Sequence, residues 1–302
     1  MHNLNKEISE KCRLIGCDVR ENAPMAEYTT FHIGGPAELL VTTDDPVRAQ
    51  KVRKLCEAED IPLLVMGNGS NLLVCDEGVK GVVLRLDGGF ALPEIRDGLV
   101  VCKAGIPLKT LCRFARDNGL SGLEFAYGIP GTVGGAVYMN AGAYDGQISG
   151  VLEWAEAVTP NGEICRFESD GLRMVYRHSV FMEIGGLVIS AAFRLRPDDP
   201  EEIGRRMDEF MRSRREKQPL EYPSAGSFFR RPEGHFAGAL IEKSGLKGCR
   251  VGEAQVSEKH AGFIINLGGA TCSDVRRLAE MVRERVYKDH GVLLQPEVCY
   301  IG

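Results

Sequence analysis

The sequence predicts an α+β fold, because short strands, hairpins and helices follow one another without the strict alternation of a doubly wound sheet. Residues 46–62 repeat apolar side chains at helical spacing and stop at Pro62. Residues 154–167 are typical of a hairpin whose turn lies at Asn161-Gly162. The length of 302 residues corresponds to about two domains.

The other elements follow from equally local signals. Short apolar runs predict three more strands, at 63–67, 81–87 and 186–195. A helix over 107–119 should end at Gly119. Thr271 and Asp274 have the spacing of a capping box at the start of another helix. The chain should close on a strand within 292–302.

A break near 196–200 divides the chain. The sequence RPDDPEEIGRRM interrupts the strand pattern and starts a helix with Pro200 in its first turn. We therefore expect a helical, partly mobile segment over 1–27, a first domain over 28–196 and a second domain over 200–302.

The composition narrows the class of protein. The net charge of −5 and the absence of a basic stripe argue against a nucleic-acid partner. No apolar run approaches the roughly 20 residues of a membrane span, and MHNLNKEISEKC lacks the apolar core of a signal peptide. The ten cysteines contain no Cys-x-x-Cys pair or zinc spacing, so we expect reduced core thiols, a cytoplasmic location and no metal.

Glycine-rich loops are the clearest functional signal. GIPGTVGGAVYMNAGAYDG, at 128–146, intersperses glycine with apolar residues that require burial, which a flexible linker would lack. Gly67-Asn68-Gly69-Ser70-Asn71 follows an apolar strand and could form a phosphate-binding nest or a tight β-turn. It matches the dinucleotide fingerprint only in part, because Leu72 stands where the third glycine belongs. With a third glycine turn at 34–36, these loops favour FAD over a mononucleotide.

Six motifs in order resemble one enzyme family. They are YTTFHIGG, GNGSNLLV, GLEFAYGIPGTVGGAVYMNAGAYD, YRHSVF, PSAGSFF and QPEV, spread over residues 28–302. Together they resemble the UDP-N-acetylenolpyruvoylglucosamine reductases, flavoenzymes that complete UDP-N-acetylmuramate for peptidoglycan synthesis. The resemblance implies non-covalent FAD in a two-lobed domain of the vanillyl-alcohol-oxidase (PCMH) type, followed by a smaller α+β substrate-binding domain.

The resemblance also assigns the cofactor-binding residues. They are expected at Gly67, Asn68, Gly69, Ser70, Asn71, Gly128, Ile129, Pro130, Gly131, Gly134, Gly135, Asn140 and Gly142. NADPH is the expected reductant. Because no second dinucleotide fingerprint is present, NADPH should visit the substrate's place and leave before the substrate binds.

The implied reaction is a conjugate reduction of an enolpyruvyl ether of UDP-N-acetylglucosamine. It needs a hydride from the flavin, stabilisation of an enolate and a proton donor. Arg177 could hold the carboxylate with its planar fork, although an arginine can equally be a surface ion pair. Ser227 matches the family's proton donor, although a serine in this context can also be a turn or cap residue. Glu297 could pair with Arg177, donate a proton with a raised pKa, or be a solvent-exposed charge.

Substrate-binding residues are expected at Tyr176, Lys217, Arg230, Arg231 and Lys259. Relatives often carry Lys-Asn before the proline, where this sequence has two arginines, so a neutral amide contact at Arg231 is replaced by a charged group. The region between 178 and 200 lacks the tyrosine-bearing insertion of some relatives, which indicates the shorter subclass. His178 is expected to be structural, and the chain to act as a monomer.

Two other readings remain. The chain could be a different flavoprotein on the same cofactor fold, such as an oxidase, but Ser227 and Glu297 in their motifs argue against this. It could also be a non-catalytic nucleotide-binding module, which would be colourless when purified.

Overall fold

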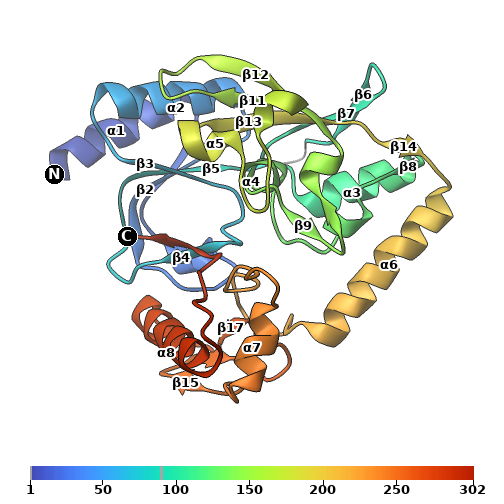
Figure 1. Cartoon of the computed structure of the whole chain (residues 1–302). Coiled ribbons are helices and arrows are strands. Elements are labelled where there is room, and N and C mark those ends of the chain that lie inside the picture. The colour runs from blue at the N-terminus through green and yellow to red at the C-terminus, as the bar shows by residue number, and fades with distance from the viewer. Residues whose placement is uncertain (1, 89–90) are drawn as a thin grey trace. The chain divides into compact units, whose positions relative to one another are not determined.

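The computed structural model describes residues 2–88 and 91–302, which form two compact units. Unit 1 contains residues 1–21, 39–68 and 81–212, and unit 2 contains residues 22–38, 69–80 and 213–302. These bounds differ from the two continuous domains that we expected, because the chain passes between the units several times (Figure 1). No helix within the described part of the chain is long and apolar enough to span a membrane.

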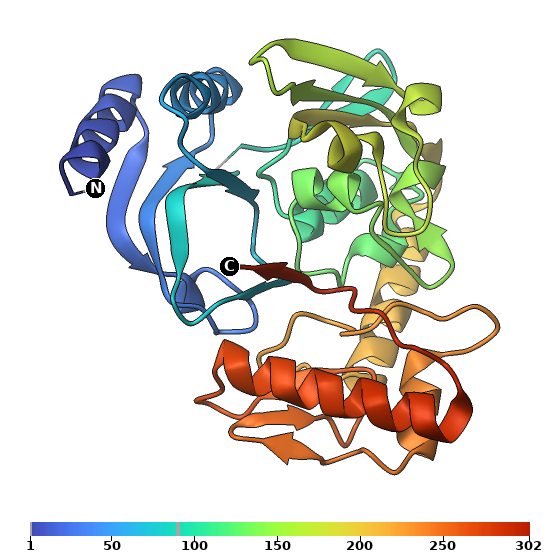
Figure 2. The same ribbon diagram turned by 60° about the vertical axis from the view of Figure 1, so that its left-hand side comes forward.

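One sheet lies under the first two helices. Its strands run in the order β1-β2-β5-β3, with β3 parallel to β5. The bounds are α1 (His2–Ile15), β1 (Asp18–Pro24), β2 (Pro36–Thr43), α2 (Pro46–Ala58), β3 (Leu63–Met66) and β5 (Val79–Leu86). Figure 2 shows α1 and α2 side by side, and their buried residues, including Ile8 and Val52, share a core with Val41 and Val82 of the strands.

The second sheet of unit 1 is antiparallel throughout and has the order β12-β11-β13-β7-β6. Its strands are β6 (Glu94–Arg96), β7 (Leu99–Lys103), β11 (Leu152–Val158), β12 (Ile164–Glu168) and β13 (Leu187–Phe193). The hairpin β11–β12 is the predicted one, with Gly162 at a φ of 76° in its turn. Helices α3 (Leu108–Asp117), α4 (Val133–Tyr138) and α5 (Val180–Ile184) complete this region.

Short strand pairs and helical turns connect these elements. The pairs are β8 (Leu120–Ser121) with β14 (Arg196–Pro197) and β9 (Gly142–Ala143) with β10 (Gly146–Gln147). The single 3₁₀ turns are η1 (Met25–Glu27), η2 (Glu124–Ala126), η3 (Ile148–Gly150) and η4 (Ser169–Leu172).

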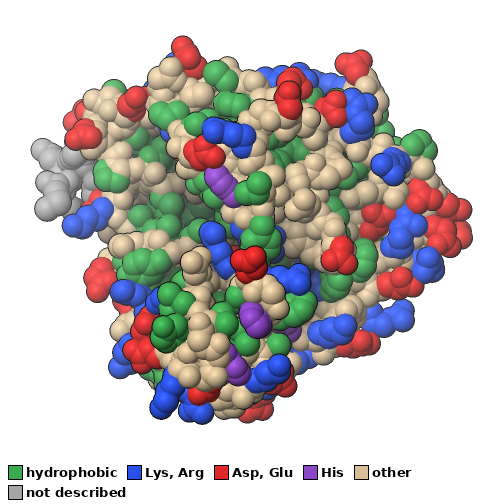
Figure 3. Space-filling model, viewed as in Figure 1, with side chains coloured by type: hydrophobic (Ala, Val, Ile, Leu, Met, Phe, Trp, Pro, Cys, Tyr) green, Lys and Arg blue, Asp and Glu red, His purple; other side chains and the backbone are tan. Residues whose placement is uncertain are grey.

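Helix α6 (Pro200–Lys217) begins at the predicted proline and is tied to η2 by a buried carboxylate. Glu124 is 8% exposed and accepts hydrogen bonds from Arg206, the Gly122 amide and the Ser121 hydroxyl. Farther along α6, Tyr144 stacks on Phe210 and donates to its carbonyl over 3.0 Å. In Figure 3 charged side chains of both signs gather at the right-hand edge, where Figure 1 draws the start of α6.

Unit 2 is built around α8, whose predicted capping box is present. Thr271 accepts from the Asp274 amide and Asp274 accepts from the Thr271 amide. The Asp76 carboxylate accepts hydrogen bonds from the next two main-chain amides, those of Cys272 at 2.8 Å and Ser273 at 3.0 Å. The other elements are β4 (Leu72–Val74), α7 (Ala237–Lys243), β15 (Arg250–Val251), β16 (Ala254–Val256), β17 (Ile264–Asn266), α8 (Cys272–His290) and β18 (Cys299–Ile301).

The local predictions agree with the structure apart from the start of the chain. The expected helices and strands are present, and Gly119 follows α3 with a φ of 65°. Residues 1–27 were expected to be helical, but only α1 and a short turn are, and Asp18–Pro24 forms an edge strand instead. Seven of the ten cysteines are buried, as expected of core residues. Within the described ranges no cluster of three potential metal ligands occurs.

We predict that Glu124→Gln destabilises unit 1 in a pH-dependent way. Burial alone would raise the pKa of Glu124, but the hydrogen bonds from Arg206 and the main chain outweigh it and lower the pKa. The carboxylate therefore stabilises the fold above its unfolded pKa, and this contribution is lost as pH falls through the folded pKa. At pH 7 the substitution should cost about 1.5–3 kcal/mol in urea unfolding, as for a hydrogen bond to a charged group.

Glu202→Gln, in an exposed pair with Arg205, is the matched control and should change the unfolding free energy by less than about 1 kcal/mol. Equal losses in the two variants, or a Glu124→Gln loss that persists unchanged at pH 3, would contradict the assignment.

Candidate functional site

The glycine-rich segment 128–146 is an ordered part of unit 1. Thr132 caps the short helix α4, and its hydroxyl accepts from the Gly135 amide at 3.4 Å. The main chain of the segment is also bonded to its neighbours: Gly134 donates to Ala104 at 2.8 Å and Val133 donates to Ile106 at 2.9 Å. The segment therefore has the fixed backbone that a cofactor loop requires.

The glycines of this region have two different reasons to be glycine. A Cβ on Gly134 would lie 2.8 Å from the Cβ of Ala104, and one on Gly67 would collide with the Thr132 hydroxyl. Protein packing therefore excludes side chains at both positions. Gly135 is exposed, and its Cβ would meet nothing nearer than the Thr132 hydroxyl at 3.6 Å. Only Gly135 of the three has open space that a bound group could use.

Two of the predicted cofactor loops meet within unit 1. The side-chain amide of Asn68 donates to the Pro130 carbonyl at 3.3 Å, and Gly67 packs on Thr132. Gly67, Asn68 and the residues from Gly128 to Gly135 thus form one surface, of the kind a large planar cofactor with phosphates would require. This surface is the main structural observation that fits FAD.

The rest of the second loop belongs to unit 2 and lies beside the C-terminal strand. Gly69 has a φ of 60° and accepts from the Thr30 amide at 3.4 Å. Asn71 accepts from the Cys299 amide at 2.8 Å, and its side-chain amide donates to the Glu297 carbonyl at 3.2 Å. Ser70, between them, is half-buried.

Arg177 occupies a strained turn. The Val175 and His178 amides donate to each other's carbonyls at 3.2 and 3.1 Å, and Arg177 between them has a φ of 54°. This conformation is unfavourable for a residue with a side chain, and such residues are concentrated at functional sites. The guanidinium donates to the Gly142 carbonyl at 3.3 Å and lies 5.0 Å from the centre of the Tyr176 ring.

Asn140 is hydrogen-bonded to the turn that contains Arg177. It is 1% exposed; its side-chain amide donates to the Val175 carbonyl at 3.0 Å, and its side-chain oxygen accepts from the Ser149 amide at 3.0 Å. These two hydrogen bonds of its side chain are thus directed to the main chain. The sequence pattern placed Asn140 among the cofactor-binding residues, and the structure adds this supporting role, which depends on contacts distant in sequence.

Ser227 and Glu297 lie on neighbouring segments of unit 2, which isolated β-bridges and main-chain hydrogen bonds join outside the named strands. Ser227 pairs with Phe263 on one side, and the Phe228 amide donates to the Gly262 carbonyl at 2.8 Å. On the other side the Glu297 amide donates to the Phe228 carbonyl at 2.8 Å. Ser227 is exposed and Glu297 half-buried, while Phe228 anchors the segment in the core. The structure therefore places two of the three predicted catalytic residues on adjacent segments of main chain.

The predicted substrate-binding cations of unit 2 are mostly exposed. Lys217 ends α6 and Arg230 follows the Ser227 segment, both with exposed side chains. Arg231 lies over the Phe236 ring at 4.1 Å, and Lys259 pairs with Glu221 at 3.5 Å. Tyr176, in unit 1, is 48% exposed.

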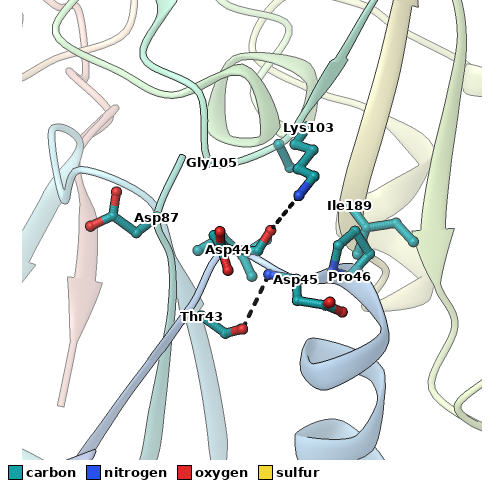
Figure 4. Close-up of a pocket in the computed structure, with 10 residues that line it drawn as sticks. Thr43, Asp44, Asp45, Pro46, Asp87, Lys103, Gly105 and Ile189 are labelled. Carbon is teal, nitrogen blue, oxygen red and sulfur yellow. Dashed lines mark hydrogen bonds between the residues drawn. The ribbon is translucent and has the colours of Figure 1, made fainter. Parts of the chain in front are cut away.

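Unit 1 also contains a small pocket (Figure 4), whose lining includes Ala104, the residue that accepts from the Gly134 amide. It is lined at the start of α2 by Asp44 and Asp45 and on the other side by Lys103, which donates to the Asp44 carbonyl at 3.2 Å. None of the predicted site residues lines it, and Asp45 serves as the cap of α2.

Sequence reasoning missed Thr132 and Gly262, which support the predicted residues. Thr132 could have been found, because a threonine before a short apolar helix is a typical N-cap. Gly262 carries no such signal: its importance comes from the distant segment with which it pairs.

Comparisons with known proteins define the class. Residues 37–168 match the FAD binding domain family, and residues 218–301 match the C-terminal domain of UDP-N-acetylenolpyruvoylglucosamine reductase. The chain is therefore an FAD oxidoreductase with an FAD-binding domain followed by the C-terminal domain of such a reductase.

Individual relatives place it more closely. It is 45% identical over 284 residues to the UDP-N-acetylenolpyruvoylglucosamine reductase of Syntrophomonas wolfei, covering 94% of this chain and 95% of that one. It is 47% identical to that of Pediococcus pentosaceus, covering 94% of each chain. The crystal structure of the Thermus caldophilus enzyme aligns with a TM-score of 0.80 at 38% identity, covering 95% of this chain and 99% of that one. The chain belongs to the UDP-N-acetylenolpyruvoylglucosamine reductase family.

We predict that Gly135→Leu loses FAD without losing the fold. The new side chain meets open space rather than protein, and leucine favours the helix more than glycine does. Any bound group that approaches the main chain there would be displaced. The measurement is the ratio of flavin to protein absorbance after purification, together with the circular dichroism spectrum.

Gly150→Leu is the control, because Gly150 is also exposed and has no atom within 4 Å of the position that a Cβ would take. It should retain the wild-type flavin content. A full complement of FAD in Gly135→Leu would show that the cofactor does not use this surface.

Proposed function

We propose that this chain reduces UDP-N-acetylglucosamine enolpyruvate to UDP-N-acetylmuramate, a step of peptidoglycan precursor synthesis, with NADPH as the reductant. The observation that carries the proposal is the main-chain pairing of the segment that contains Ser227 with the segment that contains Glu297, both inside the region that matches the family's C-terminal domain. The FAD binding domain over 37–168 supports the redox part. We expect a cytoplasmic monomer.

Non-covalent FAD would be held by the surface around Gly67, Asn68 and the loop from Gly128 to Gly135, with Gly69, Ser70, Asn71 and Gly142 as further candidates. The fit rests on the joined loops and on the open space at Gly135. When bound, the flavin supplies the hydride for the substrate's double bond. Ile129, Pro130 and Gly131 shape the loop, and Asn140 fixes the turn next to it.

Arg177 would stabilise the negative charge that develops on the enolpyruvyl carboxylate. A guanidinium can bind a carboxylate with two parallel hydrogen bonds, which strengthen as charge builds up. The strained turn, its two main-chain hydrogen bonds and the contact with Gly142 fix the direction of the guanidinium before substrate arrives. Such pre-organisation lowers the barrier more than it improves substrate binding.

Ser227 would donate the proton to the carbon next to the carboxylate. Its hydroxyl is exposed on a segment fixed by main-chain bonds at both edges, so the donor is directed without being buried. Glu297 on the neighbouring segment would act on the same enolate, as a partner for Arg177 or as a second donor. The hydrogen bond from the Glu297 amide to the Phe228 carbonyl fixes the main chain from which this carboxylate projects.

The diphosphate of the substrate would bind the cations of unit 2. Lys217, Arg230, Arg231 and Lys259 supply charge, and Arg231 takes the place of the asparagine of many relatives. Tyr176, largely exposed beside Arg177, is proposed to contact the sugar nucleotide.

Arg177→Lys should keep the charge and lose the planar fork. We expect kcat to fall by roughly 10²-fold, comparable to the loss of one oxyanion donor, with KM changed by no more than a few fold. Steady-state NADPH oxidation with varied UDP-N-acetylglucosamine enolpyruvate measures both. A raised KM at unchanged kcat would instead assign Arg177 to ground-state binding.

The two half-reactions test the function and the role of Ser227 together. In anaerobic stopped-flow absorbance, the wild type should lose its flavin absorbance with NADPH and regain it with UDP-N-acetylglucosamine enolpyruvate, but not with UDP-N-acetylglucosamine. Ser227→Ala should keep the first phase and slow the second by at least about 10²–10⁴-fold, the range for a positioned acid or base. Ser227→Cys should recover part of the rate.

If the wild type fails to regain its absorbance with the enolpyruvyl substrate, the proposed function is wrong. Slowing of both phases together in Ser227→Ala would mean that Ser227 positions the cofactor and that the proton comes from another group.

A further inference from the structure

His260 is packed in the loop that pairs with Ser227. Its ring lies edge-on to Phe263 with centroids 5.0 Å apart. On another side it abuts two glycines: a Cβ on Gly262 would lie 3.0 Å from His260 Cε1, and one on Gly238 of α7 would lie 3.3 Å from the same atom. The ring therefore has little freedom to rotate away.

One ring nitrogen of His260 accepts a hydrogen bond from the main chain. The Gly262 amide donates to Nδ1 over 3.1 Å, so this nitrogen must carry a lone pair and the proton of the neutral ring lies on Nε2. Two other hydrogen bonds fix the loop: the His260 amide donates to the Ser257 hydroxyl at 3.2 Å, and the Phe263 amide donates to the His260 carbonyl at 3.0 Å. The imidazole and the Ser257 hydroxyl are thus both side-chain acceptors for main-chain amides of this turn.

This turn is one hydrogen bond away from the proposed proton donor. The Gly262 carbonyl accepts a hydrogen bond from the Phe228 amide at 2.8 Å, and Phe263 forms a β-bridge with Ser227. The Gly262 residue therefore receives one hydrogen bond from the Ser227 segment and gives one to His260. A shift of Gly262 would change the main-chain position from which the Ser227 hydroxyl projects.

We propose that His260 is a positioning residue for Ser227. The neutral imidazole of His260 accepts from the Gly262 amide and so keeps the Ser227 segment in register. This inference rests on the proposed role of Ser227 as the proton donor. It adds a residue that has no contact with the reacting atoms and acts through the main chain.

Protonation should release this contact. A protonated imidazole carries N–H on both nitrogens, so the Gly262 amide would lose its acceptor and face another donor. Burial is the largest cause that lowers the pKa of His260 below its ordinary value, and Lys247 also lowers it; a hydrogen bond to the main chain of His260 itself and the charge of Glu242 act in the opposite direction. Lys247 and Glu242 pair with each other at 2.6 Å. Folding therefore favours the neutral form of His260. The hydrogen bond from the Gly262 amide is complete above the unfolded pKa of a histidine, near 6.5, and is lost as pH falls through the lower pKa of the folded state.

Two substitutions separate the acceptor from the ring. His260→Asn replaces Nδ1 with an amide oxygen that can accept from the amide two residues on, as in an Asx turn, and cannot be protonated in this range. His260→Phe keeps an aromatic ring and removes the acceptor. His290→Asn, at an exposed histidine of α8, is the control for loss of an unrelated histidine.

The first readout is the substrate-driven return of flavin absorbance between pH 5 and 8. The wild-type rate should fall at the acidic end, and His290→Asn should behave like the wild type. His260→Phe should be slower at all pH values, by roughly fivefold to tenfold for one lost hydrogen bond, while the NADPH-driven phase is unchanged. His260→Asn should retain most of the rate and lose the acidic fall. Equal rates and the same pH profile in all three variants would overturn the proposal.

The second readout does not depend on the reaction. In the flavin-loaded protein, amide hydrogen exchange at Gly262 and Phe228 should accelerate in His260→Phe, but not in His260→Asn, at pH 7. Unchanged exchange in His260→Phe would overturn the positioning role. If the exchange result is as expected but the wild type does not react with the enolpyruvyl substrate, the contact stands as a structural one and the proposed function fails separately.

Discussion

Main-chain pairing at both edges of the Ser227 segment is the constraint on which the candidate site of unit 2 depends. The Phe228 amide donates to the Gly262 carbonyl and the Phe228 carbonyl accepts from the Glu297 amide, so this segment is the middle one of three adjacent segments of main chain. Phe228 and Phe229 are each 4% exposed and fix its depth in the core. Burial of a phenylalanine contributes about 1.5–3 kcal/mol, which makes displacement of the segment costly. Ser227 can therefore be exposed and still be held in place.

In unit 1, glycines allow the main chain of the candidate cofactor loop to be both fixed and accessible. Gly67 and Gly134 allow main chain and side chains of the protein to approach each other, whereas Gly135 leaves space on the outside. The first kind of glycine makes the backbone rigid, and the second keeps it accessible. A cofactor loop needs both properties, because a mobile glycine loop would lose much of its binding energy to ordering. The glycine-rich composition alone shows neither arrangement.

The parts that the sequence predicted are those that local signals determine. The capping box at Thr271, the turn at Gly162 and the end of α3 at Gly119 each depend on residues within one or two turns of chain. Strand β1 was missed because it is an edge strand whose exposed residues do not alternate with buried ones. The pairing of β4 with β18 joins residues more than 200 positions apart, and no local pattern indicates it. For the same reason the sequence indicated continuous domains, whereas the compact units are discontinuous.

The same distinction applies within the candidate site. The sequence motifs identified Arg177, Ser227 and Glu297, but not the groups that direct them. Asn140 directs its buried amide to the turn that carries Arg177, across 35 residues of chain. Because an unpaired buried amide would cost about 1–3 kcal/mol, its hydrogen bonds help to stabilise a turn that is otherwise strained at Arg177. His260 is comparably placed next to the Ser227 segment, because its Nδ1 accepts from the main-chain amide of Gly262. In both units, therefore, a polar side chain bonds to the main chain near a proposed reactive residue, and we propose that it sets the direction of that residue.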